Sequence, residues 1–124
     1  MTIVVLDDDP VFRDALAENL RDDGHRVEEF ASMPGVDELR AFGEIDAVFV
    51  HYHLPEQNAL EVADRLHALY PRLPVVVLTA DPSSTIDAAV SRRQFTSLQR
   101  KPLEYGDVRT LIQQIAVERS HRRC

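Results

Sequence analysis

The chain has 124 residues, with 14 basic and 21 acidic side chains and a formal net charge of −7. This length fits one domain, and 44% apolar residues can bury a core. No apolar run approaches the roughly 20 residues that a membrane-spanning helix needs, and the only cysteine, Cys124, excludes an intramolecular disulfide. We therefore expect a single cytoplasmic domain over residues 1–124, with a core over about 2–119, a basic tail over 120–124 and no membrane contact.

The charge is distributed unevenly along the chain. Residues 1–91 carry 18 acids and 6 arginines, whereas residues 92–124 carry 3 acids, 7 arginines and one lysine. The acidic body argues against direct nucleic-acid binding, because phosphate contacts require clustered Lys and Arg. The basic C-terminal quarter indicates either a contact with an acidic partner or a solvated helix face.

Short apolar runs alternate with amphipathic segments. The apolar runs are typical of buried strands, which we expect at residues 2–6, 25–30, 45–50, 74–78 and 96–100. Apolar residues at helical spacing, bounded by Pro, Ser or Gly, predict helices over 10–23, 32–42, 57–70, 83–95 and 104–119. This alternation predicts an α/β fold with a parallel sheet and right-handed crossovers.

Polar side chains directly follow four of the apolar strands. They are Asp7 with Asp8, His51, Thr79 and Lys101. Ligands of open α/β sheets bind beyond the carboxyl ends of the strands, so we expect these side chains to converge at one sheet edge.

Each of these residues has a chemical and a structural interpretation. The carboxylates of Asp7 and Asp8 are the oxygen ligands that Mg²⁺ prefers, or helix caps. Thr79 is a hydrogen-bond donor to a phosphoryl-like oxygen, or an ordinary turn hydroxyl. Lys101 is the only lysine beside 13 arginines, which indicates a task that needs a compact point charge.

The order and spacing of these residues resemble the receiver domain of two-component response regulators over essentially the whole chain. The matching stretches are Val4–Pro10, Leu54-Pro55, Leu60-Glu61, Pro74–Ala80 and Lys101-Pro102. The resemblance implies a flavodoxin-like, doubly wound (βα)5 fold with a five-stranded parallel sheet of order 2-1-3-4-5.

The resemblance also implies roles for individual residues. Asp7 and Asp8 would be the acids that bind Mg²⁺, with the backbone carbonyl of His53 as a further ligand. Thr79 would be the switch hydroxyl, and Lys101 the lysine that contacts the phosphoryl group.

The sequence departs from the family pattern at the end of the third expected strand. The family has a phosphoacceptor Asp there and this chain has His51, while Leu98 stands at the position of the switch aromatic and Ala59 replaces a common Gly. An acyl phosphate needs a carboxylate nucleophile, and Asp46 lies at the opposite end of that strand. We therefore predict a non-enzymatic pseudo-receiver that signals by phosphorylation-independent protein contacts. It would require no cofactor, and Mg²⁺ is the metal that the resemblance admits.

A charge count predicts how such a pocket stays neutral. Neighbouring carboxylates favour a charged imidazole. We therefore expect His51 and Lys101, both cationic, to balance Asp7 and Asp8 without a metal ion.

The expected partner is a protein: a kinase, an output domain or a second receiver copy. The resemblance implies contact, including homodimer formation, through the face made by the fourth helix, the fifth strand and the last helix. The cationic residues expected on this face are Arg92, Arg93, Arg100 and Arg109.

Two alternatives remain open from the sequence. One is a receiver that is phosphorylated on Asp8 or His51, or that binds a metal such as Zn²⁺ through His51, His53 and the neighbouring acids.

The other alternative is a phosphatase. Asp7-Asp8-Asp9-Pro10-Val11 also resembles the nucleophile motif of haloacid-dehalogenase-type phosphatases, with Asp7 as nucleophile and Asp9 as acid/base. Gly106-Asp107 is the only candidate for that family's later acidic pair.

Overall fold

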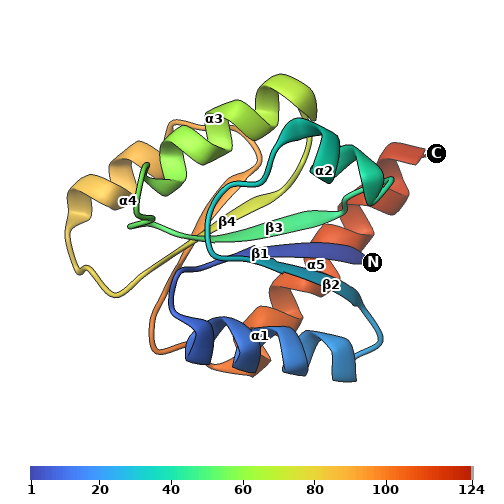
Figure 1. Ribbon diagram of the computed structural model, residues 1–124, viewed down its shortest axis with the longest axis horizontal. Coiled ribbons are helices and arrows are strands. Elements are labelled where there is room, and N and C mark those ends of the chain that lie inside the picture. Colours follow the sequence, from blue (N-terminus) through green and yellow to red (C-terminus); the bar gives the residue numbers. More distant parts are fainter. Residues whose placement is uncertain (124) are drawn as a thin grey trace.

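A computed structural model describes the backbone of residues 1–123 and the side chains of residues 1–119. All ten expected elements are present in the expected order (Figure 1). The strands are β1 (Thr2–Leu6), β2 (Arg26–Phe30), β3 (Ala47–His51), β4 (Val75–Thr79) and β5 (Thr96–Arg100). The helices are α1 (Pro10–Asp22), α2 (Val36–Ala41), α3 (Ala59–Leu69), α4 (Ser84–Ser91) and α5 (Tyr105–Arg123).

The five strands form one parallel sheet of order β2-β1-β3-β4-β5, which confirms the predicted topology. The strand order reverses at the contact between β1 and β3. There Leu6 is in register with Val50, so Asp7 and His51 follow at adjacent strand ends. Thr79 is paired with Arg100 in the same way, which places Lys101 directly beyond β5.

Helices cover both faces of the sheet. The layer of α2, α3 and α4 packs on one face and the layer of α1 and α5 on the other (Figure 1). Alternate residues of one strand enter different cores: Val4 and Leu6 face the first layer, whereas Ile3 and Val5 face the second. Central strands are therefore apolar on both faces, as the uninterrupted apolar runs predict.

Local capping sets several helix boundaries. The Asp9 carboxylate accepts hydrogen bonds from the backbone N–H of Val11 and Phe12, at 3.0 and 3.4 Å, and Pro10 occupies the first turn of α1. This helix ends before Gly24, whose φ of +92° belongs to the left-handed region that glycine tolerates. The sequence therefore determines both ends of α1.

Three helix boundaries differ from the predicted ones by four residues, and the others by no more than two. Helix α2 begins at Val36, after Pro34, because a proline disfavours helical conformation in the residue before it. Helix α4 ends at Ser91, and Phe95, expected to be helical, has a left-handed φ of +56°. Helix α5 continues to Arg123, so residues 120–123, expected as a tail, are helical. Within residues 1–123, none of the helices has the length and apolar content to cross a membrane.

Candidate functional site

Asp7 is the fully buried acid at the centre of the site. Its side chain follows β1 and is 0% exposed. Oδ1 accepts a hydrogen bond from the backbone N–H of Asp9 at 2.9 Å, and Oδ2 accepts one from Lys101 Nζ at 2.9 Å. A buried carboxylate needs such partners, because an unpaired charge in the interior is costly.

Lys101 reaches Asp7 from the loop after β5. Its backbone N–H donates to the carbonyl of Thr79 at 2.8 Å, which anchors the loop beside β4. The ammonium also lies 3.7 Å from the centre of the Phe12 ring, a cation–π contact, and the side chain is 15% exposed. The only lysine of the chain is thus enclosed by a carboxylate and an aromatic ring. The Lys101-Pro102 peptide bond is cis.

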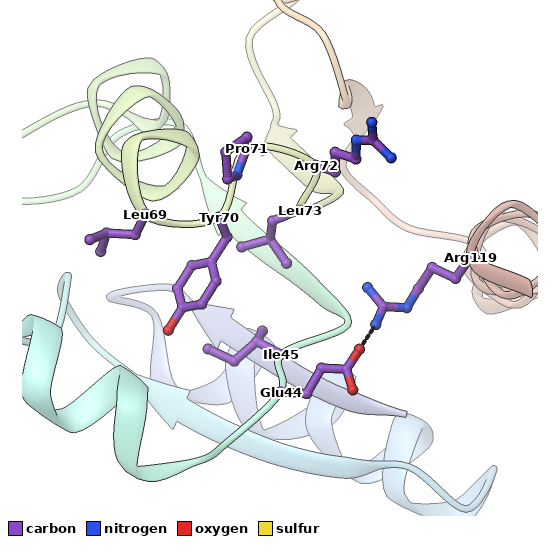
Figure 2. A pocket seen from close by; sticks show the side chains of 8 residues that line it. All are labelled: Glu44, Ile45, Leu69, Tyr70, Pro71, Arg72, Leu73 and Arg119. Atoms are coloured by element: carbon purple, nitrogen blue, oxygen red, sulfur yellow. Dashed lines mark hydrogen bonds and ion pairs between the residues drawn. The ribbon is translucent and has the colours of Figure 1, made fainter. Parts of the chain in front are cut away.

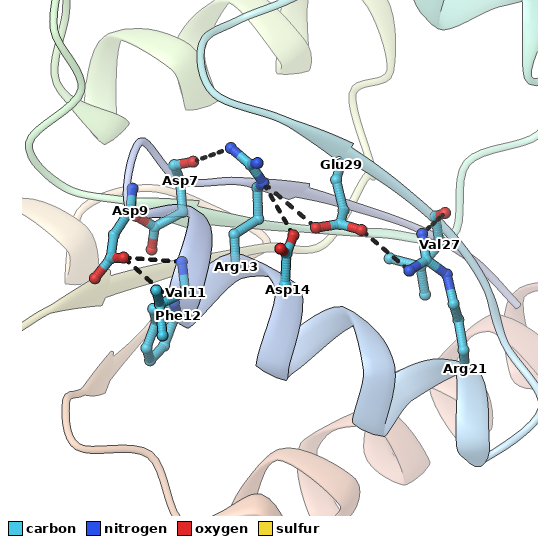
Figure 3. A network of polar contacts seen from close by, with 9 residues as sticks. All are labelled: Asp7, Asp9, Val11, Phe12, Arg13, Asp14, Arg21, Val27 and Glu29. Atoms are coloured by element: carbon cyan, nitrogen blue, oxygen red, sulfur yellow. Dashed lines mark hydrogen bonds and ion pairs between the residues drawn. The ribbon is translucent and has the colours of Figure 1, made fainter.

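A chain of polar contacts holds the backbone of Asp7 (Figure 3). The guanidinium of Arg13 donates to the Asp7 carbonyl at 3.0 Å and to Glu29 Oε1 at 3.3 Å. Arg21 donates to the other oxygen of Glu29 at 3.0 Å and to the Val27 carbonyl at 2.9 Å. These contacts tie α1 and β2 to the site. The sequence analysis missed Arg13 and Phe12, because both read as ordinary positions of an amphipathic helix.

His51 ends β3 beside the two acids. One ligand atom each from Asp7, Asp8 and His51 can be chosen so that all lie within 4.8 Å of one another. Asp8 is exposed, whereas His51 is partly buried. The Nδ1 atom of His51 is buried and has no hydrogen-bond partner among the described residues. The structure therefore brings together the acids and the imidazole, as predicted.

The predicted charge of His51 is wrong. Burial lowers the pKa of the imidazole below its ordinary value of 6.5, and the nearby Lys101 ammonium lowers it further. Asp7 and Asp8 raise this pKa, but their effects are smaller. The reason is that Lys101 already neutralises Asp7, so a second cation gains little and loses its hydration. The pocket holds one ion pair, an imidazole whose neutral form burial favours, and the exposed Asp8.

Thr79 ends β4 next to Lys101, which follows β5, but the Thr79 side chain makes a local contact. It is fully buried, and its Oγ1 accepts a hydrogen bond from the backbone N–H of Asp81 at 3.0 Å. This is the turn-hydroxyl interpretation; the hydroxyl keeps its proton for donation elsewhere. Leu98 packs at the edge of the core under α2, α3 and α4. The switch roles of both residues stay predictions.

Asp46 lies at the opposite end of β3, as the sequence predicts. Its carboxylate accepts from the Thr2 backbone N–H at 2.7 Å and pairs with Arg119 of α5 at 2.7 Å. Arg119 also pairs with Glu44, and both residues line a pocket of about 490 Å³ together with Tyr70 and Leu73 (Figure 2). Asp46 thus links α5 to the end of the sheet that lies opposite the candidate site.

Comparison with known proteins identifies the fold family. The sequence matches the family described as response regulator receiver domain over residues 3–113. The chain belongs to this family. Receiver domains are signalling domains of two-component systems, and the five-stranded order observed here is theirs.

Several relatives contain a similar receiver as part of a longer protein. The chain is 26% identical over 121 residues to the DNA-binding transcriptional regulator NtrC of a Bradyrhizobium species, covering 98% of this chain and 25% of NtrC. It is 35% identical over 96 residues to protein-glutamate methylesterase/protein-glutamine glutaminase 3 of Hahella chejuensis, covering 76% and 26%. The chain therefore spans about a quarter of the length of these curated relatives.

Solved structures show the same fold. A CheY-like receiver domain protein of Methanospirillum hungatei superposes with a TM-score of 0.84 at 20% identity, covering 98% of this chain and 97% of that one. NtrX of Brucella abortus, solved in complex with ATP, gives a TM-score of 0.85 at 22% identity, covering 98% of this chain and 28% of NtrX.

The receiver assignment leaves the phosphatase reading without support. Asp9, the acid/base of that reading, uses its carboxylate to cap α1. Asp107 is exposed in the first turn of α5 and lies in no metal-binding group of the described residues. The three consecutive acids therefore have different environments: Asp7 is buried, Asp8 is exposed and Asp9 caps α1.

The residues present do not fit the Mg²⁺ that receiver domains imply. Mg²⁺ requires near-octahedral oxygen ligands and is usually held by carboxylates and water. Here the third member of the ligand group is an imidazole nitrogen, whereas Mg²⁺ favours oxygen ligands. The side chain of His53 is exposed and lies outside this ligand group. The role of its backbone carbonyl as a metal ligand stays a prediction.

The four arginines of the predicted partner face do not form one free basic patch. Arg93 pairs with Asp64 of α3 at 3.0 Å, and Arg100 pairs with Asp87 of α4 at 2.9 Å. Arg109 instead pairs with Asp23 beside α1 at 3.0 Å, on the other face of the sheet. Arg92 is exposed at the end of α4. Three of the four arginines are thus occupied by intramolecular ion pairs.

Proposed function

We propose that this receiver domain transmits a signal through protein contacts that do not require phosphorylation at the end of β3. The observation that carries the proposal is the imidazole of His51 beside Asp7 and Asp8, where the family has its phosphoacceptor acid. Among the described residues, the ligand group at this strand end contains no third carboxylate.

The chemistry of the pocket supports this proposal. A phosphoacceptor carboxylate attacks phosphorus to form an acyl phosphate, and Asp7 is not available for that role. Asp7 is fully buried and is bonded to Lys101 and to the Asp9 backbone. Asp8 is exposed and lies one residue beyond it. Lys101, which would contact a phosphoryl group by family resemblance, already has an anionic partner at 2.9 Å.

The proposed domain is a cytoplasmic, non-enzymatic interaction module. Its partner would be a kinase, an output domain or a second receiver copy, contacted through α4, β5 and α5. Because Arg93 and Arg100 are held in ion pairs, Arg92 is the residue of this surface that we expect to meet an acidic partner. The longer relatives support an output domain as one class of partner.

Intact-mass measurement after incubation with acetyl phosphate and Mg²⁺ tests the proposal. We expect no mass gain for the wild-type chain. The His51→Asp variant restores the acid at the end of β3, so we expect it to gain one phosphoryl group. A phosphoryl gain by the wild type would overturn the proposal. The Asp8→Asn and His51→Asn variants would then show which residue accepts the group.

Partner contacts supply the second arm of the test. Proteins captured from the host by the wild type should be captured equally by His51→Asn and equally before and after acetyl phosphate treatment. Loss of a wild-type contact on removal of phosphoryl donors would contradict phosphorylation-independent signalling.

A further inference from the structure

The ligand group at the end of β3 contains two kinds of donor atom. Asp7 and Asp8 provide carboxylate oxygens, and His51 provides an imidazole nitrogen. Oxygen-only groups suit Mg²⁺ and Ca²⁺, whereas imidazole suits Zn²⁺, Ni²⁺, Cu²⁺ and iron. Replacing one acid by histidine therefore changes the class of cation that this strand end fits.

The geometry of the group is compatible with one ion. Its three ligand atoms lie within 4.8 Å of one another. Two ligands of a tetrahedral Zn²⁺, each about 2.1 Å from the metal, lie about 3.4 Å apart. Closing the group thus requires side-chain adjustments of less than about 1.5 Å, which rotation of the exposed Asp8 and of the His51 ring can supply.

Two further observations favour a cation here. Nδ1 of His51 is buried without a hydrogen-bond partner among the described residues, and buried polar atoms of native proteins nearly always have one. The ion pair of Asp7 with Lys101 does not block binding, because each carboxylate oxygen can accept more than one contact. With Lys101 offsetting only one of the two acids, the group also keeps a net negative charge.

We infer that Asp7, Asp8 and His51 form a binding site for a divalent transition metal of the Zn²⁺ and Co²⁺ class, in place of the Mg²⁺ site of phosphorylatable receivers. Water completes the coordination. This inference stands apart from the proposed function, since a metal could bind whether or not the chain is phosphorylated.

Titration with Co²⁺ and Zn²⁺ tests the site. The metal-free protein, carrying Cys124→Ser to remove a thiolate ligand, would be titrated with Co²⁺ by visible absorption and with Zn²⁺ and Mg²⁺ by calorimetry. We expect one Co²⁺ or Zn²⁺ per chain and at least ~100-fold weaker binding of Mg²⁺. His51→Asn should lower the Zn²⁺ affinity by at least ~10-fold, and Asp8→Asn should also weaken it.

His53→Asn is the matched control. The ring centre of His53 is 6.2 Å from that of His51, and the His53 side chain is exposed and outside the ligand group. Its removal should therefore change the Zn²⁺ affinity less than twofold. His51→Asp should move the preference toward Mg²⁺. Far-ultraviolet circular dichroism would establish that each variant is folded.

The inference is overturned if Zn²⁺ does not bind, if His51→Asn binds it unchanged, or if His53→Asn lowers the affinity equally. Any of these outcomes would leave the phosphorylation assay unaffected, so the two proposals fail separately.

Discussion

Removing the ammonium of Lys101 provides the sharpest test of how the pocket is held together. Lys101→Met keeps an unbranched side chain beside Phe12 but removes the ammonium, so the cation–π contact is lost and the carboxylate of Asp7 loses its cation. Asp7 is 0% exposed and cannot turn to solvent. After the substitution its remaining side-chain partner is the backbone N–H of Asp9. We therefore expect a large loss of stability.

The magnitude follows from the geometry. At an effective dielectric constant of about 20, opposite charges separated by the observed 2.9 Å attract by about 6 kcal/mol before desolvation is counted. Breaking a buried pair by removing one partner costs about 3–5 kcal/mol. Since Lys101 is 15% exposed, we expect about 3 kcal/mol. Asp7→Asn should cost less, about 1–2 kcal/mol, because the freed ammonium can reach water.

A double-variant cycle measured by urea unfolding tests this reasoning. In the Asp7→Asn background, Lys101→Met should cost less than about 1 kcal/mol, which gives a coupling free energy of about 2 kcal/mol or more. Arg92→Met, which removes an exposed charge, should change the free energy of unfolding by no more than about 0.5 kcal/mol. An equal cost of Lys101→Met in both backgrounds would refute a coupled buried ion pair.

Two further predictions concern the residues around this pair. The pKa of His51 is lower in the folded state than in the unfolded chain. As the pH falls through about 6.5, His51 therefore binds a proton more readily in the unfolded chain, and the free energy of unfolding decreases. Urea unfolding between pH 7.5 and 5 should therefore show a smaller loss of stability for His51→Asn than for the wild type. Identical curves for the two proteins would contradict the lowered pKa. Arg13→Met should cost about 1–3 kcal/mol, because the Asp7 carbonyl and Glu29 each lose a hydrogen bond to a charged donor. A chemical-denaturation difference below about 0.5 kcal/mol would show that Arg13 does not position Asp7.

The sequence by itself determined which segments become strands and helices and which polar groups meet. The side chains of an uninterrupted apolar run such as residues 74–78 are all buried only in a strand whose sheet has helices on both faces. Parallel strands end at one edge, so Asp7, His51, Thr79 and Lys101 had to converge there. Local chemistry also set the ends of α1, since Asp9 caps it and Gly24 adopts the left-handed conformation that ends it.

Only the tertiary structure decided which of these groups are partners and what charge they carry. Lys101 pairs with Asp7, 94 residues away. Burial, together with the charge of Lys101, lowers the pKa of the His51 imidazole, where local charge counting predicts a cation. Arg109 of α5 likewise pairs with Asp23 beside α1, and it does not join a basic surface with the arginines of α4 and β5. Periodicity and capping act between neighbours in the sequence, whereas desolvation and ion pairing depend on which distant elements the fold places within a few ångströms.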